Sequence, residues 1–292
     1  MKTQRIAAAR VVAGVMLSGL LLAAGCTGVS EFNGKGVTSS TTTSTTGSAA
    51  STCQSIAVPA YIYPSYLGSG WNTAISDSPW NKKVNRIMIM NPGSGPGTAA
   101  NSDYQNIVKA VHKAGGLVYG YVYTNYGAIS LASAEAQVNE YQTWYGVDGI
   151  FVDATSADAA LVPTYYQPFA TYITTQIPNA GVMLNVGTYP DPSYAAITVP
   201  TTSALSINVF ENDYATYAAA GGIPAWATSY PASLFVNIVY NTSAAELANA
   251  LTLSVQHNVG TVYITDGTLP NPYGQLPSYW SQLVAQTQAA CK

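Results

Sequence analysis

Short apolar runs recur along the chain from residue 56 onward, separated by stretches that suit helices. Eight runs are rich in Val, Ile, Leu and Tyr, and we expect strands at 57–63, 85–90, 117–123, 149–153, 181–186, 204–210, 234–240 and 261–265. Their apolar character is almost continuous rather than alternating. Strands of this kind are buried on both faces, which is typical of a parallel sheet covered by helices.

The stretches between these runs carry helix signals. An amphipathic pattern predicts helices at 103–114, 132–145 and 243–257, and each has a Ser or Asp near its start that can cap it. Eight β/α units within about 235 residues predict a single-domain α/β protein with the (β/α)8 TIM-barrel fold. The alternative is a doubly wound open sheet, which needs fewer strands and gives no reason for a count of eight.

The first 52 residues have a different pattern from the rest. Lys2, Arg5 and Arg10 precede an apolar run at 11–24 that is too short for an ordinary membrane span, which predicts a secretory signal peptide at 1–25. The run ends in Leu-Leu-Ala-Ala-Gly-Cys, which resembles a bacterial lipobox. We therefore expect lipidation at Cys26, although secretion without lipid is the alternative. Residues 26–52 are rich in Ser and Thr and predict a flexible tether, which leaves 53–292 for the barrel.

Composition fits a protein outside the cytoplasm. Only 8% of residues are charged and 48% are hydrophobic, and the net charge is -3, or near -6 without the three cations of the signal peptide. Nucleic acid is an improbable partner because phosphate binding needs a basic patch. With Cys26 lipidated, Cys53 and Cys291 remain to form a disulfide in an oxidising compartment, and two free thiols are the alternative. We expect a monomer, held by its lipid to a membrane at the bacterial cell surface or in the periplasm.

Polar residues follow most of the predicted strands, and two of them are carboxylates directly after buried apolar runs. Active sites of this fold lie at the carboxyl ends of the strands. Asp153 and Glu211 follow strands two apart in sequence order, so a closed barrel brings them to one mouth. Cleavage of a glycosidic bond needs such a pair, with one group protonated to assist the leaving group. Helix capping or pairing with Lys is the alternative role, although the chain has only ten Lys and Arg residues.

Aromatic and amide side chains at the same strand ends suggest contacts with sugar. The chain has 22 tyrosines, and sugar rings stack on aromatic faces while their hydroxyl groups bond to phenols and amides. The candidate substrate-binding residues are Tyr63, Asn91, Tyr123, Asn125, Tyr126, Asn185 and Asp266. A zinc site or a Cys–His nucleophile is disfavoured because His112 and His257 fall on predicted helices. We expect neither a metal nor a cofactor.

Five segments in this order resemble motifs of the spherulin 4 family. They are Val-Pro-Ala-Tyr-Ile-Tyr-Pro-Ser at 58–65, the Pro- and Gly-rich loop at 91–97, Gly-Tyr-Val-Tyr-Thr-Asn-Tyr-Gly at 120–127, Val-Asp-Gly-Ile-Phe-Val-Asp at 147–153 and Val-Tyr-Ile-Thr-Asp at 262–266. The resemblance implies a (β/α)8 barrel that cleaves α-1,4-linked galactosamine or N-acetylgalactosamine polymers of microbial biofilms without a metal. It also implies that Asp153 and Glu211 are the catalytic residues.

The sequence departs from that family pattern beside the first carboxylate. The family usually has Asp-Glu where this chain has Asp153-Ala154, and often Asp where it has Asn125. We expect a surface-tethered glycoside hydrolase for an amino-sugar polymer. If the enzyme retains anomeric configuration, we expect Asp153 as nucleophile and Glu211 as acid and base. The alternative from another class is a non-catalytic polysaccharide-binding protein, because loss of the second carboxylate affects activity and specificity without affecting the fold.

Overall fold

The computed structural model describes residues 53–64, 70–77 and 85–289. The predicted signal peptide at 1–25, the tether at 26–52 and Cys26 within it lie outside these residues. Cys291, the predicted partner of Cys53, also lies outside them. The lipidation and the disulfide therefore stay predictions.

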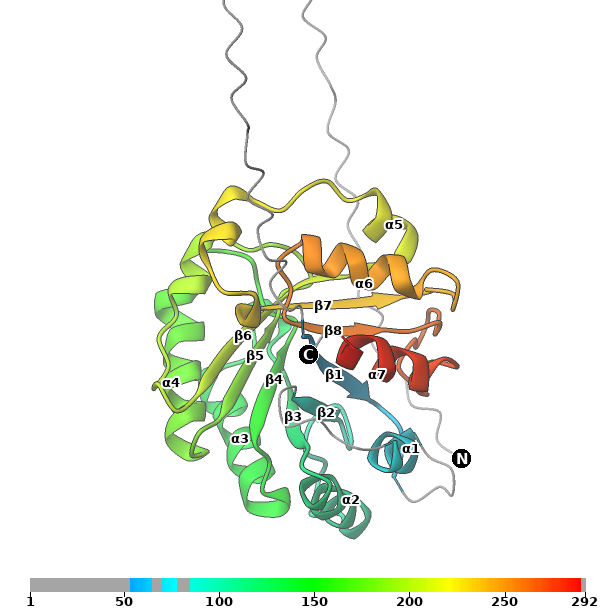
Figure 1. Ribbon diagram of the computed structural model, residues 1–292. Helices are drawn as coiled ribbons and strands as arrows, with labels where there is room; N and C mark the ends of the chain where they lie inside the picture. The colour runs from blue at the N-terminus through cyan, green and yellow to red at the C-terminus, as the bar shows by residue number, and fades with distance from the viewer. Residues whose placement is uncertain (1–52, 65–69, 78–84, 290–292) are drawn as a thin grey trace, which may run out of the picture. The chain divides into compact units, whose positions relative to one another are not determined.

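Within the described residues, eight parallel strands form a closed barrel in which each strand pairs with the next and β8 pairs with β1 (Figure 1). The strands are β1 (Ser55–Ala60), β2 (Arg86–Met90), β3 (Leu117–Tyr123), β4 (Gly149–Asp153), β5 (Gly181–Asn185), β6 (Ala204–Asp213), β7 (Phe235–Tyr240) and β8 (Thr261–Ile264). The predicted (β/α)8 barrel is confirmed. The open sheet is excluded because a closed barrel has no edge strands.

Helices lie around the outside of this barrel (Figure 1). They are α1 (Gly70–Ser76), α2 (Ser102–Lys113), α3 (Leu131–Tyr145), α4 (Gln167–Gln176), α5 (Tyr214–Ala219), α6 (Leu247–Gln256) and α7 (Trp280–Ala289). Shorter helical turns are η1 (Asn125–Gly127), η2 (Val162–Tyr166), η3 (Pro192–Ala196), η4 (Ala225–Ser229) and η5 (Ala232–Leu234). In the described part of the chain, none of the helices has the length and apolar content that a membrane span requires.

The sequence specifies the ends of α2 and α3 through capping residues. The Asn101 side chain accepts hydrogen bonds from the backbone N–H groups of Asp103 and Tyr104 at the start of α2. Ser130 accepts one from Ser133 at the start of α3, which ends at Gly146 with a positive φ of 65°. Such caps satisfy backbone groups that have no partner within the helix.

The barrel interior is filled by side chains from the strands. The five residues of β2 are all buried, including Arg86, whose guanidinium donates to the backbone oxygen of Asp77 at 2.6 Å. Near the start of β5, Gly181 lies against the ring of Tyr119, and a Cβ at this position would overlap the phenol oxygen. Glycine is therefore required there by the close approach of the tyrosine.

Two strand ends differ from the prediction in a way that affects the site. The first strand ends at Ala60 rather than at residue 63, so Tyr61 and Tyr63 belong to the loop that follows it. The sixth strand continues to Asp213 rather than ending at 210, and its pairing with β7 shifts between Asn208 and Phe210. Pairing with β7 extends β6 beyond its apolar run, so Glu211 lies inside the strand.

Candidate active site

Three neighbouring strands bring Asp153, Asn185 and Glu211 together at the carboxyl-terminal mouth of the barrel. Asp153 ends β4, Asn185 ends β5, and Glu211 lies on β6. The amide nitrogen of Asn185 donates to Oδ1 of Asp153 at 2.7 Å and to Oε2 of Glu211 at 2.8 Å. Since both oxygens contact one nitrogen, they lie no more than about 5.5 Å apart. Asn185 was predicted as a substrate ligand, and the structure places it between the two carboxyl groups.

A tyrosine holds the other oxygen of each carboxyl group. Tyr121 donates to Oδ2 of Asp153 at 2.5 Å, and Tyr273 donates to Oε1 of Glu211 at 2.5 Å. The ring of Tyr61 packs edge-on against both tyrosines, with ring centres 5.7 Å apart in each case. Each carboxyl group therefore has a donor on both oxygens, which fixes its orientation before substrate binds.

Sequence reasoning missed these two tyrosines for different reasons. Tyr121 lies two residues before Tyr123 on β3, so strand alternation places both on one face, and this signal was present in the sequence. Tyr273 lies in the segment between β8 and α7, 62 positions from Glu211. No local pattern indicates a contact between residues so far apart in the chain.

The environment of Glu211 favours its protonated form. Burial raises the pKa of Glu211, the negative charge of Asp153 raises it further, and the donors Tyr273 and Asn185 partly oppose both effects. Burial, with the neighbouring carboxylate, also raises the pKa of Tyr121 and of Tyr273. The tyrosines therefore remain donors at neutral pH. Glu211 is thus favoured as a carboxylic acid, and it lies beside Asp153, whose carboxyl group accepts hydrogen bonds from Tyr121 and Asn185. Acid-assisted bond cleavage needs a pair of carboxyl groups of this kind.

Backbone strain is concentrated beside Asp153. Asn125, Tyr126 and Ala154 have positive φ angles of 47°, 57° and 48°. The hydroxyl of Thr124 donates to the backbone oxygens of Asp153 and Ala154, each at 2.9 Å, and Tyr126 N–H donates to the Ala154 oxygen at 2.7 Å. These bonds hold the left-handed residues in place. Strain of this kind is common at functional sites, where surrounding structure maintains it.

Tyrosines predicted to bind substrate occupy the rim of the mouth. Tyr63 and Tyr126 are exposed at 39% and 56%. The Tyr63 hydroxyl donates to Asp103 at 2.8 Å, and the Tyr123 hydroxyl donates to Oδ1 of Asn125 at 3.0 Å. Two of the predicted ligands, Tyr123 and Asn125, are therefore hydrogen-bonded to each other. Their contact with substrate stays a prediction.

Two other predicted ligands, Asn91 and Asp266, make hydrogen bonds within their own loops. Oδ1 of Asn91 accepts from Gly95 N–H at 2.9 Å, and the Asp266 carboxylate accepts from the hydroxyl and the N–H of Ser278. Both side chains thereby shape loops at the mouth of the barrel. Direct contact of either one with substrate stays a prediction.

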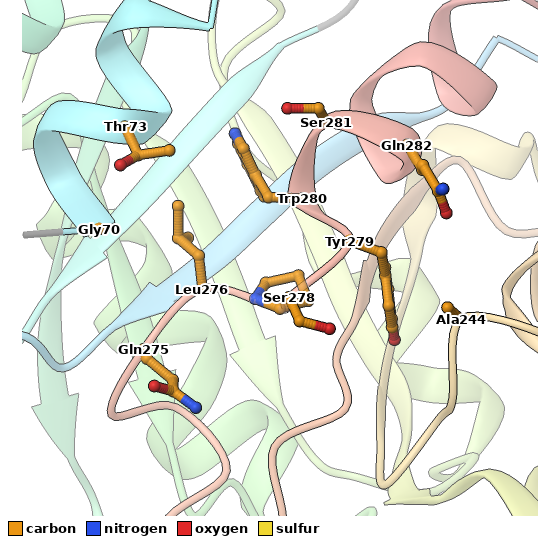
Figure 2. Close-up of a pocket in the computed structure, with 11 residues that line it drawn as sticks. Gly70, Thr73, Ala244, Gln275, Leu276, Ser278, Tyr279, Trp280, Ser281 and Gln282 are labelled. Atoms are coloured by element: carbon orange, nitrogen blue, oxygen red, sulfur yellow. The ribbon is translucent and has the colours of Figure 1, made fainter.

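A hollow lies beside the mouth, between α1 and the start of α7. It has a volume of about 580 Å³ and is lined by Gly70, Thr73, Ala244 and residues 275–282 (Figure 2). Leu276 and Trp280 are among its apolar lining residues, and its described lining includes no charged residue. Asp153 and Glu211 are not among the residues that line it. The carboxyl pair therefore lies outside this hollow.

The histidines lie away from the carboxyl pair. His112 on α2 contacts Oδ2 of Asp148 at 2.7 Å, and that oxygen also accepts from Val118 N–H near the start of β3, at the opposite end of the barrel. His257 caps the end of α6. Among the residues that the structure describes, no group of three or more His, Cys, Asp or Glu side chains is placed to hold a metal ion.

The fold and the site together define a parallel (β/α)8 barrel with a hydrogen-bonded carboxyl pair at its carboxyl-terminal mouth. The chain belongs to the spherulation-specific family 4, whose family model matches residues 55–287. It is 30% identical over 243 residues to Spherulin-4 of Physarum polycephalum, covering 80% of this chain and 69% of the relative. It also resembles the crystal structure of Aspergillus clavatus Sph3 in complex with GalNAc, at 22% identity. That match has a TM-score of 0.68 and covers 80% of this chain and 97% of the other, so it supports the same fold.

Proposed function

We propose that this protein is a glycoside hydrolase with Asp153 and Glu211 as its catalytic residues. The observation that carries the proposal is the shared contact of both carboxyl groups with the Asn185 amide at 2.7 and 2.8 Å. Retaining glycosidases hold their carboxyl groups about 5 to 5.5 Å apart, whereas inverting ones need about 6.5 to 9.5 Å to admit a water. The upper limit set by Asn185 for these two oxygens favours retention of configuration.

The environments of the two carboxyl groups suggest their roles. Glu211, whose pKa is raised by burial, gives its proton to the glycosidic oxygen while an ionised Asp153 oxygen attacks the anomeric carbon. The leaving sugar departs as an alcohol, and a covalent glycosyl–Asp153 ester remains. Glu211, now ionised, takes a proton from water, whose oxygen attacks the same carbon and releases Asp153 as a carboxylate.

The substrate that we propose is an α-linked polymer of galactosamine or N-acetylgalactosamine, as in a microbial biofilm matrix. Support comes from membership of the family and from the likeness to Sph3, whose crystal structure holds GalNAc. The exposed rings of Tyr63 and Tyr126 offer faces on which sugar rings can stack. Amide and phenol groups at the rim offer partners for hydroxyl and acetamido groups.

The test is to incubate the purified protein with biofilm polysaccharides and with partly deacetylated polygalactosamine, and to count new reducing ends. Asp153→Asn and Glu211→Gln should each lower turnover by about 10²-fold or more, because each removes the charge or the proton that the transition state needs. Polysaccharide binding should persist in both. Glu135→Gln on α3, a helix that contributes neither carboxyl group, is the matched control and should retain wild-type turnover. Turnover that survives Asp153→Asn would contradict the assignment.

A second candidate function is polysaccharide binding without cleavage, which the alanine at position 154 favours. In that case the wild type produces no reducing ends from any polymer, and both carboxyl substitutions change only affinity. Ala154→Glu would then be the variant to assay for restored cleavage. Wild-type turnover abolished by either carboxyl substitution would exclude this alternative.

We also propose that the barrel is tethered to a membrane through a lipid on Cys26 and that Cys53 pairs with Cys291. The apolar run before Cys26 and the Ser- and Thr-rich segment after it support the tether. Cys26→Ser should release the protein from the membrane fraction. Peptide mass spectrometry of the mature protein should find the 53–291 disulfide, and two free thiols at these positions would contradict it.

A further inference from the structure

Asn208 lies behind the carboxyl pair and is fully buried on β6. It is the direct register partner of Asn185 on the neighbouring strand β5, and their side-chain amides are in contact at 2.6 Å. The other end of the Asn208 amide lies 2.9 Å from the backbone oxygen of Phe210 and 2.8 Å from that of Val236. The register shift of β6 between Asn208 and Phe210 occurs at the same place.

These groups form a chain with an acceptor at each end. It runs from the two backbone carbonyls through Asn208 and Asn185 to the carboxyl groups of Asp153 and Glu211. Carbonyl and carboxylate oxygens only accept hydrogen bonds, and each amide has one donor end and one acceptor end. The chain has three junctions, and two amides supply donors for only two of them.

One junction is therefore mismatched whenever both carboxyl groups are ionised. If the Asn185 nitrogen faces the carboxylates, its oxygen faces Asn208, which cannot donate to Asn185 and to the backbone carbonyls with the same end. A buried contact between two acceptors is unfavourable because neither can be satisfied by water there. A proton on a carboxyl group supplies the missing donor. Both amides then turn, so that Asn208 donates to the carbonyls, Asn185 donates to Asn208, and the carboxylic acid donates to the Asn185 oxygen.

We propose that Asn208 is a positioning residue that acts through Asn185 to favour a proton on the Asp153–Glu211 pair. The roles of the two carboxyl groups in hydrolysis rest on the function proposed above, whereas the proton affinity of the pair does not. When Glu211 holds the proton, its hydroxyl donates to the turned Asn185 oxygen, and the Asp153 carboxylate keeps Tyr121 as its donor. The backbone carbonyls beside the β6 register shift thereby favour the acid form that cleavage requires.

The other groups facing the pair are phenols, which remain neutral at working pH. Five tyrosines lie near enough to Asp153 or Glu211 for the carboxyl charge to raise their pKa. They are Tyr61, Tyr121, Tyr123, Tyr240 and Tyr273. Burial and the charge of Asp153 raise the pKa of Glu211, in the same direction as the amide chain. The contribution of the amides can therefore be measured only by removing it.

Asn208→Leu is the test, with Asn237→Leu as its matched control. Leucine has nearly the shape of asparagine, so the Asn185 nitrogen can face both carboxylates without an opposing acceptor behind it. The high-pH limb of kcat/KM should move about one pH unit lower, the size expected for one buried hydrogen-bond mismatch. Asn237 is also buried, on the neighbouring strand β7, and its amide donates to Tyr217 at 2.7 Å rather than to Asn185 or to either carboxyl group, so its replacement should leave the limb in place.

A titration without substrate separates this inference from the function. Infrared difference spectra report the carboxylic acid carbonyl band, which Glu211→Gln identifies by its loss. Its midpoint should fall by about one unit in Asn208→Leu and stay unchanged in Asn237→Leu. An unchanged midpoint would overturn the proposal. A rise would also overturn it, because it would mean that Asn208 merely fixes the Asn185 nitrogen against two carboxylates.

A measurement on the wild type covers the case in which Asn208→Leu does not fold. The side-chain ¹⁵N resonance of Asn208 should titrate with the midpoint of the Glu211 band, because both amides turn as the proton leaves. An Asn208 resonance that does not respond to this titration would overturn the proposal. If the wild type does not cleave polysaccharide, the proposed function is refuted, but both titrations can still be interpreted.

Discussion

Replacing Ala154 with glycine should stabilise the protein, because this alanine has the left-handed backbone conformation with φ of 48°. A side chain in that conformation costs about 1–2 kcal/mol, which glycine avoids. Glycine also gains conformational freedom in the unfolded chain, which offsets about 0.4–1 kcal/mol. The free energy of unfolding should therefore rise by about 0.5–1 kcal/mol in Ala154→Gly.

Urea unfolding followed by circular dichroism measures this change, and the midpoint of thermal unfolding should rise by about 1–4 °C. Ala132→Gly is the matched control, since Ala132 is exposed in the first turn of α3 with helical geometry and its replacement should lower the free energy of unfolding by up to about 1 kcal/mol. Opposite signs for the two variants are the expected result. If Ala154→Gly is destabilised as much as Ala132→Gly, the hydrogen bonds from Thr124 and Tyr126 do not hold a strained residue, and the reasoning fails.

Three further changes test the site and the core. Glu211→Gln should raise the free energy of unfolding at pH values above the ordinary pKa of Glu. The reason is that a carboxyl group whose pKa is raised in the folded state makes the wild type less stable as pH rises. Urea titrations at several pH values should show that the variant's extra stability vanishes in acid. Glu246→Gln is the control and should lower the free energy of unfolding at the same pH values, since hydrogen bonds from Ser243 lower the pKa of Glu246. Tyr273→Phe removes a donor that lowers the Glu211 pKa, so the high-pH limb of kcat/KM should move up, and a downward shift would contradict the contact. Gly120→Ala places a Cβ 2.5 Å from the Tyr141 ring and should lower the free energy of unfolding by about 1–3 kcal/mol, measured in urea.

Much of the fold follows from the sequence alone. Eight apolar runs indicated eight strands because residues buried on both faces must be apolar whatever their neighbours are. The runs at β3 and β4 match the observed strands at both ends. The catalytic candidates followed from the same logic, since a carboxylate directly after a buried run lies at the strand end where this fold places its chemistry.

The local sequence pattern did not predict how the strands are paired and in which register. The prediction ended the sixth strand at residue 210, because polar side chains follow it, whereas pairing with β7 extends β6 to Asp213. Asn185 was expected to contact substrate, yet β5 lies between β4 and β6, so its amide contacts both Asp153 and Glu211. Strand order and register are properties of the closed barrel, and hydrophobic periodicity does not specify them.

Apolar runs and strand-end carboxylates determined the class of fold and the candidate residues for acid chemistry, because each of these signals depends on the nearest few positions in the chain. Only the tertiary structure determined how those residues are held. Tyr273 reaches Glu211 from 62 positions away, and Asn208 meets Asn185 across a strand pair. Barrel closure decides such contacts, because it fixes which distant side chains share a buried space in which every polar group needs a partner.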